Sequence, residues 1–152
     1  MKVLIVFATN SGGTQLAADL AKETFLKNNH QAVIKEVREV NPDEFANFDL
    51  VILSSPSWDY EGLEGQPHPD YRPFMEAAHG KKFAGKKFAV LGLGDSSYTY
   101  FCGAVDNLEN FVRELGGTFI DKSLKIDGFY LDQATNSQKI TDWSQNLAQK
   151  LS

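Results

Sequence analysis

The chain of 152 residues contains one cysteine, five prolines and no long hydrophobic segment. Because Cys102 is the only cysteine in the sequence, an intramolecular disulfide and a cysteine cluster for a metal are excluded. A single cysteine also agrees with a reducing compartment. The longest apolar run, from Val3 to Ala8, is far shorter than the roughly 18 residues of a membrane span. It is also too short for the core of a secretory signal, so a cytoplasmic location without membrane contact is expected.

Positive charge is also scarce, because 15 Lys and Arg face 20 Asp and Glu, for a formal net charge of -5. This sign is wrong for a protein that binds nucleic acid or an anionic membrane, and it favours basic partner proteins. The excess is concentrated in one stretch that contains a single arginine and the acidic residues Asp59, Glu61, Glu64, Asp70 and Glu76. This acidic stretch is interpreted as a docking face, with a merely solvated loop as the alternative.

A composition of 42% hydrophobic, 12% aromatic and 23% charged residues is typical of a globular protein with a substantial core. At this length, residues 1–152 are expected to form a single domain. Strand-like apolar runs alternate with amphipathic helical patterns from end to end, which predicts an α/β fold with a parallel sheet.

Five strands are predicted, and three of them are continuously apolar, as expected for strands covered on both faces. They are Lys2 to Ala8, Ala32 to Val37, Asp49 to Ser54, Lys87 to Gly92 and, interrupted by Asp121 and Lys122, Thr118 to Ile126. Helices are predicted after Thr14, from about Tyr71 to His79, from Val105 to Leu115 and from about Thr135 to Leu151. A turn is predicted over Asn41 to Phe48. The prediction is an open doubly wound five-stranded parallel sheet with helices on both faces.

The first strand leads into a segment that is rich in hydroxyl, amide and glycine residues and that precedes the first helix. Its residues are Thr9, Asn10, Ser11, Gly12, Gly13 and Thr14. Successive backbone N–H groups at a helix N-terminus bind phosphate, and the segment has no Lys or Arg and lacks both the P-loop and the G-x-G-x-x-G patterns. It therefore favours a monophosphate, although the same residues also occur in an ordinary helix-capping turn.

Two further loops place aromatic residues at the same edge of the predicted sheet. Trp58 and Asp59 follow the third strand after Ser55 and Ser57, and Tyr98 follows the fourth strand after Gly94 and Asp95. An aromatic residue in a polar loop is typical of a stacking site, although either ring could also pack against the domain itself.

With these three loops the chain resembles the short-chain flavodoxins over essentially its whole length, with the most specific motif running from Gly94 to Asp106. The resemblance implies strand order 2-1-3-4-5 and non-covalent binding of flavin mononucleotide (FMN). It implies that residues 9–14 hold the phosphate and that Trp58 and Tyr98 sandwich the isoalloxazine ring. Backbone groups of Asp95, Tyr100 and Cys102 would meet the pyrimidine edge of the ring. The residues Gly94, Phe101, Ser55, Ser57 and Asp59 would complete the site, and the Asp127-Gly128 turn would lie near it.

One position departs from the family pattern. Flavodoxins often have glycine directly after the aromatic residue of the second loop, where a peptide flips when the flavin is reduced. In this chain the position is Asp59, for which the flipped turn is expected to cost about 1 kcal/mol more than for glycine.

The resemblance implies a low-potential one-electron carrier, not an enzyme, that shuttles electrons between a reductase and an acceptor as a monomer. An acidic surface and an uncompensated phosphate both oppose the negative charge of the fully reduced ring, which agrees with a low potential. The alternative is an FMN-dependent NAD(P)H:quinone reductase of the same architecture, which rings covering both flavin faces would obstruct. The sequence suggests no side-chain nucleophile with a base and no metal ligand set.

Overall fold

The structure is a computed structural model, and it describes residues 1–9, 12–60, 63–97 and 101–151. The strands of its main sheet are β1 (Lys2–Phe7), β2 (Gln31–Glu36), β3 (Leu50–Pro56), β6 (Lys87–Gly94), β7 (Thr118–Phe119) and β8 (Leu124–Asp127). A second, two-stranded sheet consists of β4 (Trp58–Tyr60) and β5 (Leu63–Gln66). The helices are α1 (Gly13–Lys27), α2 (Tyr71–Ala78), α3 (Gly103–Glu114) and α4 (Gln133–Leu151). Short 3-10 helices are η1 (Val37–Glu39), η2 (Pro42–Asn47) and η3 (Phe129–Asp132).

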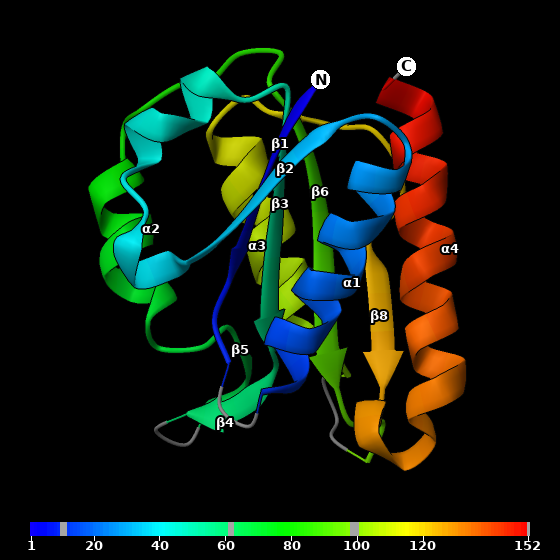
Figure 1. Cartoon of the computed structure of the whole chain (residues 1–152). Coiled ribbons are helices and arrows are strands. Elements are labelled where there is room, and N and C mark those ends of the chain that lie inside the picture. Colours follow the sequence, from blue (N-terminus) through cyan, green and yellow to red (C-terminus); the bar gives the residue numbers. More distant parts are fainter. Residues whose placement is uncertain (10–11, 61–62, 98–100, 152) are drawn as a thin grey trace.

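The main sheet has the order β2-β1-β3-β6, and its outer position beside β6 is shared by β7 and β8 (Figure 1). Every pair of neighbouring strands in it is parallel. The predicted doubly wound sheet of order 2-1-3-4-5 is therefore confirmed, with one difference. The fifth strand is divided into two short strands, and the break includes Asp121 and Lys122, where the apolar pattern is interrupted.

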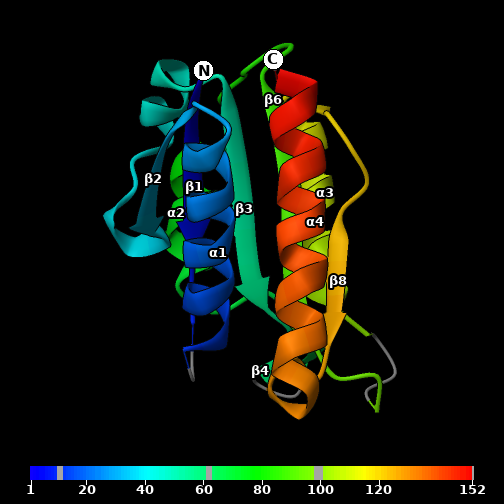
Figure 2. The ribbon, with the colours of Figure 1, turned by 45° about the vertical axis from the view of Figure 1, so that its right-hand side comes forward.

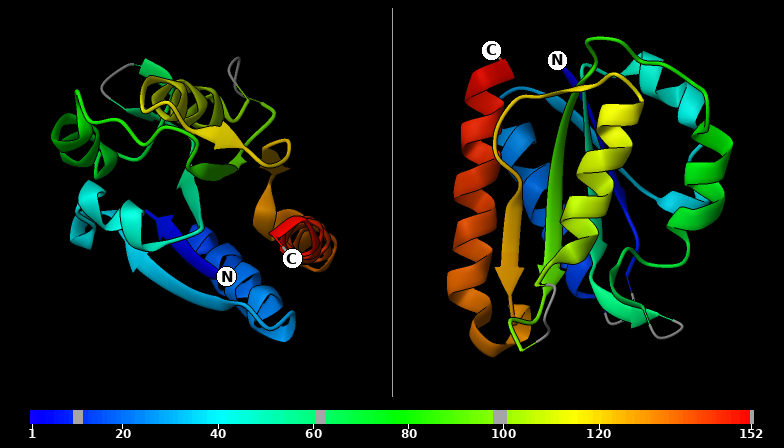
Figure 3. Two further views of the ribbon diagram at one scale, coloured as in Figure 1. Left: turned by 90° about the horizontal axis from the view of Figure 1, so that it is seen from above. Right: turned by 180° about the vertical axis from the view of Figure 1, so that it is seen from behind.

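The helices cover both faces of this sheet, with α1 and α4 on one side and α2 and α3 on the other (Figure 3). Alternate residues of β1 serve the two faces: Val3 and Ile5 pack with α1 and α4, whereas Leu4 and Val6 pack with α2 and α3. Because both faces are buried, the central strands have continuous runs of residues without polar side chains, at 3–7, 50–53 and 88–94.

Helices α1 and α4 run side by side (Figure 2), although they come from opposite ends of the chain. The amides of Asn28 and Gln145 join them by a reciprocal pair of hydrogen bonds, of 2.8 and 3.0 Å. Trp143 lies on the core side of α4, as the apolar stripe of this helix predicts. It packs against two hydrophobic clusters that lie between the sheet and helices α1 and α4.

The hairpin formed by β4 and β5 is not predicted from the sequence, which indicates only a polar loop there. Trp58 pairs with Gln66 and Tyr60 with Leu63 in an antiparallel register with an irregularity between them. The hairpin lies below the carboxyl ends of β3 and β6 in Figure 1. Within the described ranges, no helix is long and apolar enough to cross a membrane.

Candidate functional site at the carboxyl edge of the sheet

The carboxyl ends of β1, β3, β6 and β8 lie at one edge of the molecule because these strands are all parallel. The ends of β1, β3 and β6 lead into residues 8–12 before α1, the hairpin β4–β5, and residues 95–102 before α3, and the end of β8 leads into the Asp127-Gly128 turn. The connection after β1 leads to β2 on one side and the connection after β3 leads to β6 on the other, so this edge holds the topological switch point, between β1 and β3. Ligands of open α/β sheets bind at that position.

The segment before α1 has the geometry of an anion-binding loop. Gly12 has a left-handed backbone with φ 88°, and its N–H donates a hydrogen bond of 2.8 Å to the Thr9 hydroxyl. The first intrahelical bond runs from the Leu16 N–H to the Gly12 carbonyl, so the N–H groups of the first turn before Leu16 have no acceptor within the helix. Asn10 and Ser11 lie outside the described residues.

These residues fit a phosphate group. The first turn of α1 contains no acidic residue that would compete for the amides. Since its oxygen accepts from Gly12, the Thr9 hydroxyl keeps its hydrogen available for an anion. A Cβ at Gly13 would lie 3.2 Å from Leu93 Cδ2 and 3.4 Å from Tyr130 Cε2, so this turn has little room for a side chain. Backbone amides, a helix N-terminus and a hydroxyl together can bind a monophosphate without a cationic side chain.

Tyr130 is a residue of this edge that sequence reasoning did not select. A Cβ at Gly12 would lie 3.6 Å from its hydroxyl oxygen, so its ring stands against the anion-binding loop from η3. Its neighbour Leu131 is 90% exposed. The feature of the sequence that indicates Tyr130 is the row of apolar residues directly after Gly128, at the end of the fifth strand.

The Asp127-Gly128 turn, which also belongs to this edge, is bonded to the segment after β6. The Asp127 carboxylate accepts from the Ser96 N–H at 2.9 Å, and the Gly128 N–H donates to the Gly94 carbonyl at 2.9 Å. The turn therefore fixes the base of the loop that carries Asp95 and Tyr98.

Two serines predicted to contact the flavin have bonds within the protein. The Ser55 hydroxyl donates to the Pro56 carbonyl at 2.8 Å and accepts from the His68 N–H at 2.9 Å. The Ser57 hydroxyl accepts from the Ala104 N–H at 3.0 Å, in the first turn of α3. Both side chains are buried, and these bonds hold the start and the end of the hairpin segment.

The aromatic sandwich remains a prediction. The backbone of Trp58 forms the first residue of β4, directly after the buried Ser57. Tyr98 and Tyr100 lie outside the described residues, and Asp59 is described only by its place in β4. β4 follows β3 and the segment before α3 follows β6, and these two strands are neighbours in the sheet.

Cys102 ends the third loop and precedes α3 with a left-handed backbone of φ 50°. Its thiol is buried, 3.8 Å from the carbonyl oxygens of Gly92 and Ile126, and burial raises its pKa to about 12. A Cβ at Gly94 would lie 2.8 Å from this sulfur, so glycine is required there. Cys102 thus directs its side chain into the core and has only its backbone to offer a ligand. Phe101, the preceding residue, is partly buried and packs against the core on the same side.

Asp95 is fully exposed at the same edge. Its carboxylate accepts a hydrogen bond of 2.8 Å from the Ser97 N–H, and this bond lowers the pKa of the carboxyl group. Asp95 therefore carries its negative charge throughout the neutral range, next to the place predicted for the flavin.

The fold and this edge define an open doubly wound α/β protein with a loop at its switch point whose geometry fits a phosphate group. The flavodoxin family model matches residues 5–139. The flavodoxin of Maridesulfovibrio salexigens is 34% identical over 151 residues, which cover 99% of each chain. The flavodoxin of Nitratidesulfovibrio vulgaris is 32% identical over 143 residues, which cover 93% of each chain. This chain belongs to the flavodoxin family.

Solved structures agree with this assignment. Oxidised flavodoxin 2 from Bacillus cereus superposes with a TM-score of 0.88 at 30% identity, covering 99% of each chain. Flavodoxin from Fusobacterium nucleatum, solved with FMN bound, shares the fold with a TM-score of 0.81 at 22% identity over 98% of each chain. The resemblance stated from the sequence is confirmed, and so is its functional class: an FMN-binding electron carrier and not an enzyme. The quinone reductase alternative is not favoured.

Proposed function

We propose that residues 1–152 form one domain that works as a monomeric, cytoplasmic, low-potential one-electron carrier. In this proposal the FMN phosphate lies on residues 9–14, and the ring lies between Trp58 and Tyr98. The ring's pyrimidine edge faces the backbone of Asp95, Tyr100 and Cys102. The observation that carries the proposal is the cation-free loop before α1, with its left-handed Gly12 bonded to Thr9.

The proposal also assigns roles to the other residues of the predicted site. Gly94 and Phe101 belong to the same loop as Asp95 and are retained. Ser55 and Ser57 are retained only as residues that hold the loop around Trp58, because their hydroxyls already have protein partners. Asp59 is retained as the residue whose backbone lies next to the ring.

The binding step is tested by adding FMN to the flavin-free full chain and following flavin absorbance and tryptophan emission. We expect a 1:1 complex with strong quenching of the emission, and weaker binding of riboflavin, which lacks the phosphate. A stepwise anaerobic reduction of the complex then gives both midpoint potentials. A protein that stays colourless and unquenched in excess FMN would refute the proposed site.

We further propose that electron-transfer partners are basic proteins that dock on the acidic stretch from Asp59 to Glu76. Within it, Asp70 is an ion-pair partner of Arg38, with Oδ2 and Nε 3.4 Å apart, so its charge is partly compensated. Glu76 is exposed on α2. The electrostatic attraction between such a face and a basic patch speeds association and is screened by salt.

The docking step is tested by measuring the rate of reduction by a purified basic reductase against ionic strength. We expect the rate to fall as salt rises, and Glu76→Gln to slow it about 2-fold at low salt. Glu23→Gln, on the exposed side of α1, is the matched control and should leave the rate unchanged. A rate that is independent of salt would contradict docking by charge while leaving FMN binding intact.

A further inference from the structure

Helix α3 holds the two segments that would cover the flavin. Its first residue, Gly103, directly follows the loop of residues 95–102. The same first turn binds the hairpin β4–β5, which begins with Trp58. Three connections, from three positions on α3, join this helix to the hairpin segment.

The first connection is a backbone-to-backbone contact. A Cβ at Gly103 would lie 2.7 Å from the carbonyl oxygen of Gly65 and 2.8 Å from its Cα, so any other residue at 103 would collide with β5. The second is the hydrogen bond from the Ala104 N–H to the Ser57 hydroxyl, at the residue before Trp58. Both connections lie at the first turn of the helix.

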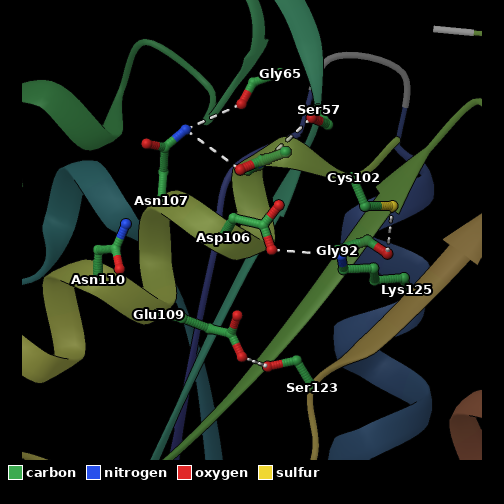
Figure 4. Close-up of polar contacts among 12 residues, drawn as sticks. Ser57, Gly65, Gly92, Cys102, Asp106, Asn107, Glu109, Asn110, Ser123 and Lys125 are labelled. Carbon is green, nitrogen blue, oxygen red and sulfur yellow. Dashed lines mark hydrogen bonds and ion pairs between the residues drawn. The ribbon is translucent and has the colours of Figure 1, made fainter. Parts of the chain in front are cut away.

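The third connection is the side chain of Asn107, one turn along α3 (Figure 4). Its amide nitrogen donates to the Gly65 carbonyl at 3.0 Å and to the Gly103 carbonyl of its own helix at 3.2 Å. Because both partners are carbonyl oxygens, the contact requires a side chain with two N–H donors, which Asn has and Asp or Leu lacks.

The position of Gly65 makes this contact relevant to the flavin. Gly65 precedes Gln66, and Gln66 is the cross-strand partner of Trp58. Asn107 therefore fixes the strand that lies beside the residue predicted to stack on the ring. Ala or Leu at this interior position would stabilise the helix more than Asn does, since Asn is a poorer helix former than either.

We propose that Asn107 is a positioning residue that holds the Trp58 hairpin against α3 and thereby tunes the affinity and the midpoint potential of the bound flavin. This inference rests on the proposed function. Stacking of an aromatic ring favours the neutral oxidised flavin over its electron-rich reduced form. Loss of the Asn107 contact loosens the hairpin, so binding of oxidised FMN weakens more than binding of reduced FMN. The potential of the bound flavin then moves upward, toward that of free FMN.

The test compares Asn107→Ala and Asn107→Leu with Asn110→Ala and Asn110→Leu in the full chain. Asn110 lies three residues further along α3, is exposed, and accepts a hydrogen bond of 3.0 Å from Arg113 Nη1 (Figure 4 labels both asparagines). Ala and Leu are strong helix formers, so both pairs of variants should keep α3 intact. Leu also keeps the branching of Asn at Cγ and the same number of side-chain heavy atoms.

The first readout is amide hydrogen exchange over residues 63–66, with and without FMN. We expect exchange about 10-fold faster in both Asn107 variants and unchanged in both Asn110 variants. The second readout is the potential of the two-electron couple together with the dissociation constant for oxidised FMN. A loss of affinity that is tenfold larger for oxidised than for reduced FMN corresponds to a rise of roughly 30 mV.

The outcomes separate the two claims. Exchange and potentials that match the Asn110 variants would overturn the proposal, and so would faster exchange with an unchanged potential, which would leave Asn107 with a purely structural role. If the unmodified chain bound no FMN, the proposed function would fail, while exchange in the flavin-free chain would still show whether Asn107 anchors the hairpin.

Discussion

The hydroxyl of Tyr71 bonds to both backbone groups of Ser54. It accepts from the Ser54 N–H at 3.1 Å and donates to the Ser54 carbonyl at 2.8 Å, with the Val6 carbonyl 3.3 Å away. Tyr71 is the first residue of α2 and is fully buried, and burial raises the pKa of its phenol. One side chain thus joins α2 to the ends of β1 and β3, from which the anion-binding loop and the hairpin leave.

Tyr71→Phe is expected to destabilise the protein by about 1 to 3 kcal/mol, because it leaves the buried Ser54 N–H without this partner. Urea unfolding followed by circular dichroism measures the loss. Tyr130→Phe is the comparison, since it removes the same group from a side chain that is 52% exposed and should therefore cost less stability than Tyr71→Phe. Equal effects of the two substitutions would contradict the role assigned to Tyr71.

The carboxylate of Glu44 gives a pH-dependent contribution to stability. It accepts from Lys35 Nζ at 2.6 Å and from the Asn41 N–H at 2.8 Å, as half of the capping box of η2. These two bonds, the one from Lys35 first, lower the pKa of Glu44. The stabilisation is therefore complete above the ordinary pKa of about 4.3 and is lost as the pH falls through the lowered folded value.

Glu44→Gln should accordingly be about 1 kcal/mol less stable than the wild type at pH 7, and the difference should shrink below about pH 4. Urea midpoints of the two proteins at pH 7, 5 and 3.5 test this. Glu39→Gln, at an exposed position in η1, supplies the comparison and should match the wild type at every pH. A difference that persists unchanged at pH 3.5 would show that the charge of Glu44 is not its cause.

The buried thiol of Cys102 should be unreactive in the folded protein. Only the thiolate attacks disulfide reagents, and a pKa of about 12 leaves very little of it at pH 8. We expect labelling by a disulfide reagent to be roughly 1,000-fold slower than for a free cysteine, and to reach one thiol per chain after unfolding. Rapid labelling of the native protein would mean that the loop before α3 opens often.

How far the sequence alone predicts this fold is clearest at the fifth strand. The interruption at Asp121 and Lys122 was visible, but its cause was not. The Lys122 carbonyl accepts from Trp143 Nε1 at 3.0 Å, and Lys150 pairs with the Asp121 carboxylate at 3.3 Å, so the chain between β7 and β8 bonds to α4. Contacts with helix residues that lie more than 20 positions further along the chain leave no periodic signal in the strand itself.

The candidate site shows the same limit. Residue types and spacing indicated the anion-binding loop, because hydroxyls and glycines before a helix have a local cause. They did not indicate the hairpin β4–β5, whose place depends on Gly103 and Asn107, nor that the hydroxyls of Ser55 and Ser57 bind backbone groups. The packing of Tyr130 against Gly12 likewise joins two ends of the chain.

Gly12→Ala should separate the phosphate contribution from general backbone strain. At φ 88°, an alanine costs about 1 to 2 kcal/mol in conformational energy, and relief of that strain would turn the loop amides away from an anion. Gly85→Ala is the matched control, because Gly85 also has a positive φ, of 76°, has open space around its Cβ position and lies in the turn before β6, away from the carboxyl edge.

Both substitutions should therefore lower stability by a similar amount, and only Gly12→Ala should weaken FMN binding, by roughly 10-fold or more. Riboflavin binding to the two variants should remain equal, since riboflavin has no phosphate to lose. Titration of each flavin-free variant with FMN and with riboflavin gives the four constants. If Gly12→Ala weakened riboflavin as much as FMN, the loop before α1 would be acting on the ring and not on the phosphate, and the assignment of residues 9–14 would be wrong.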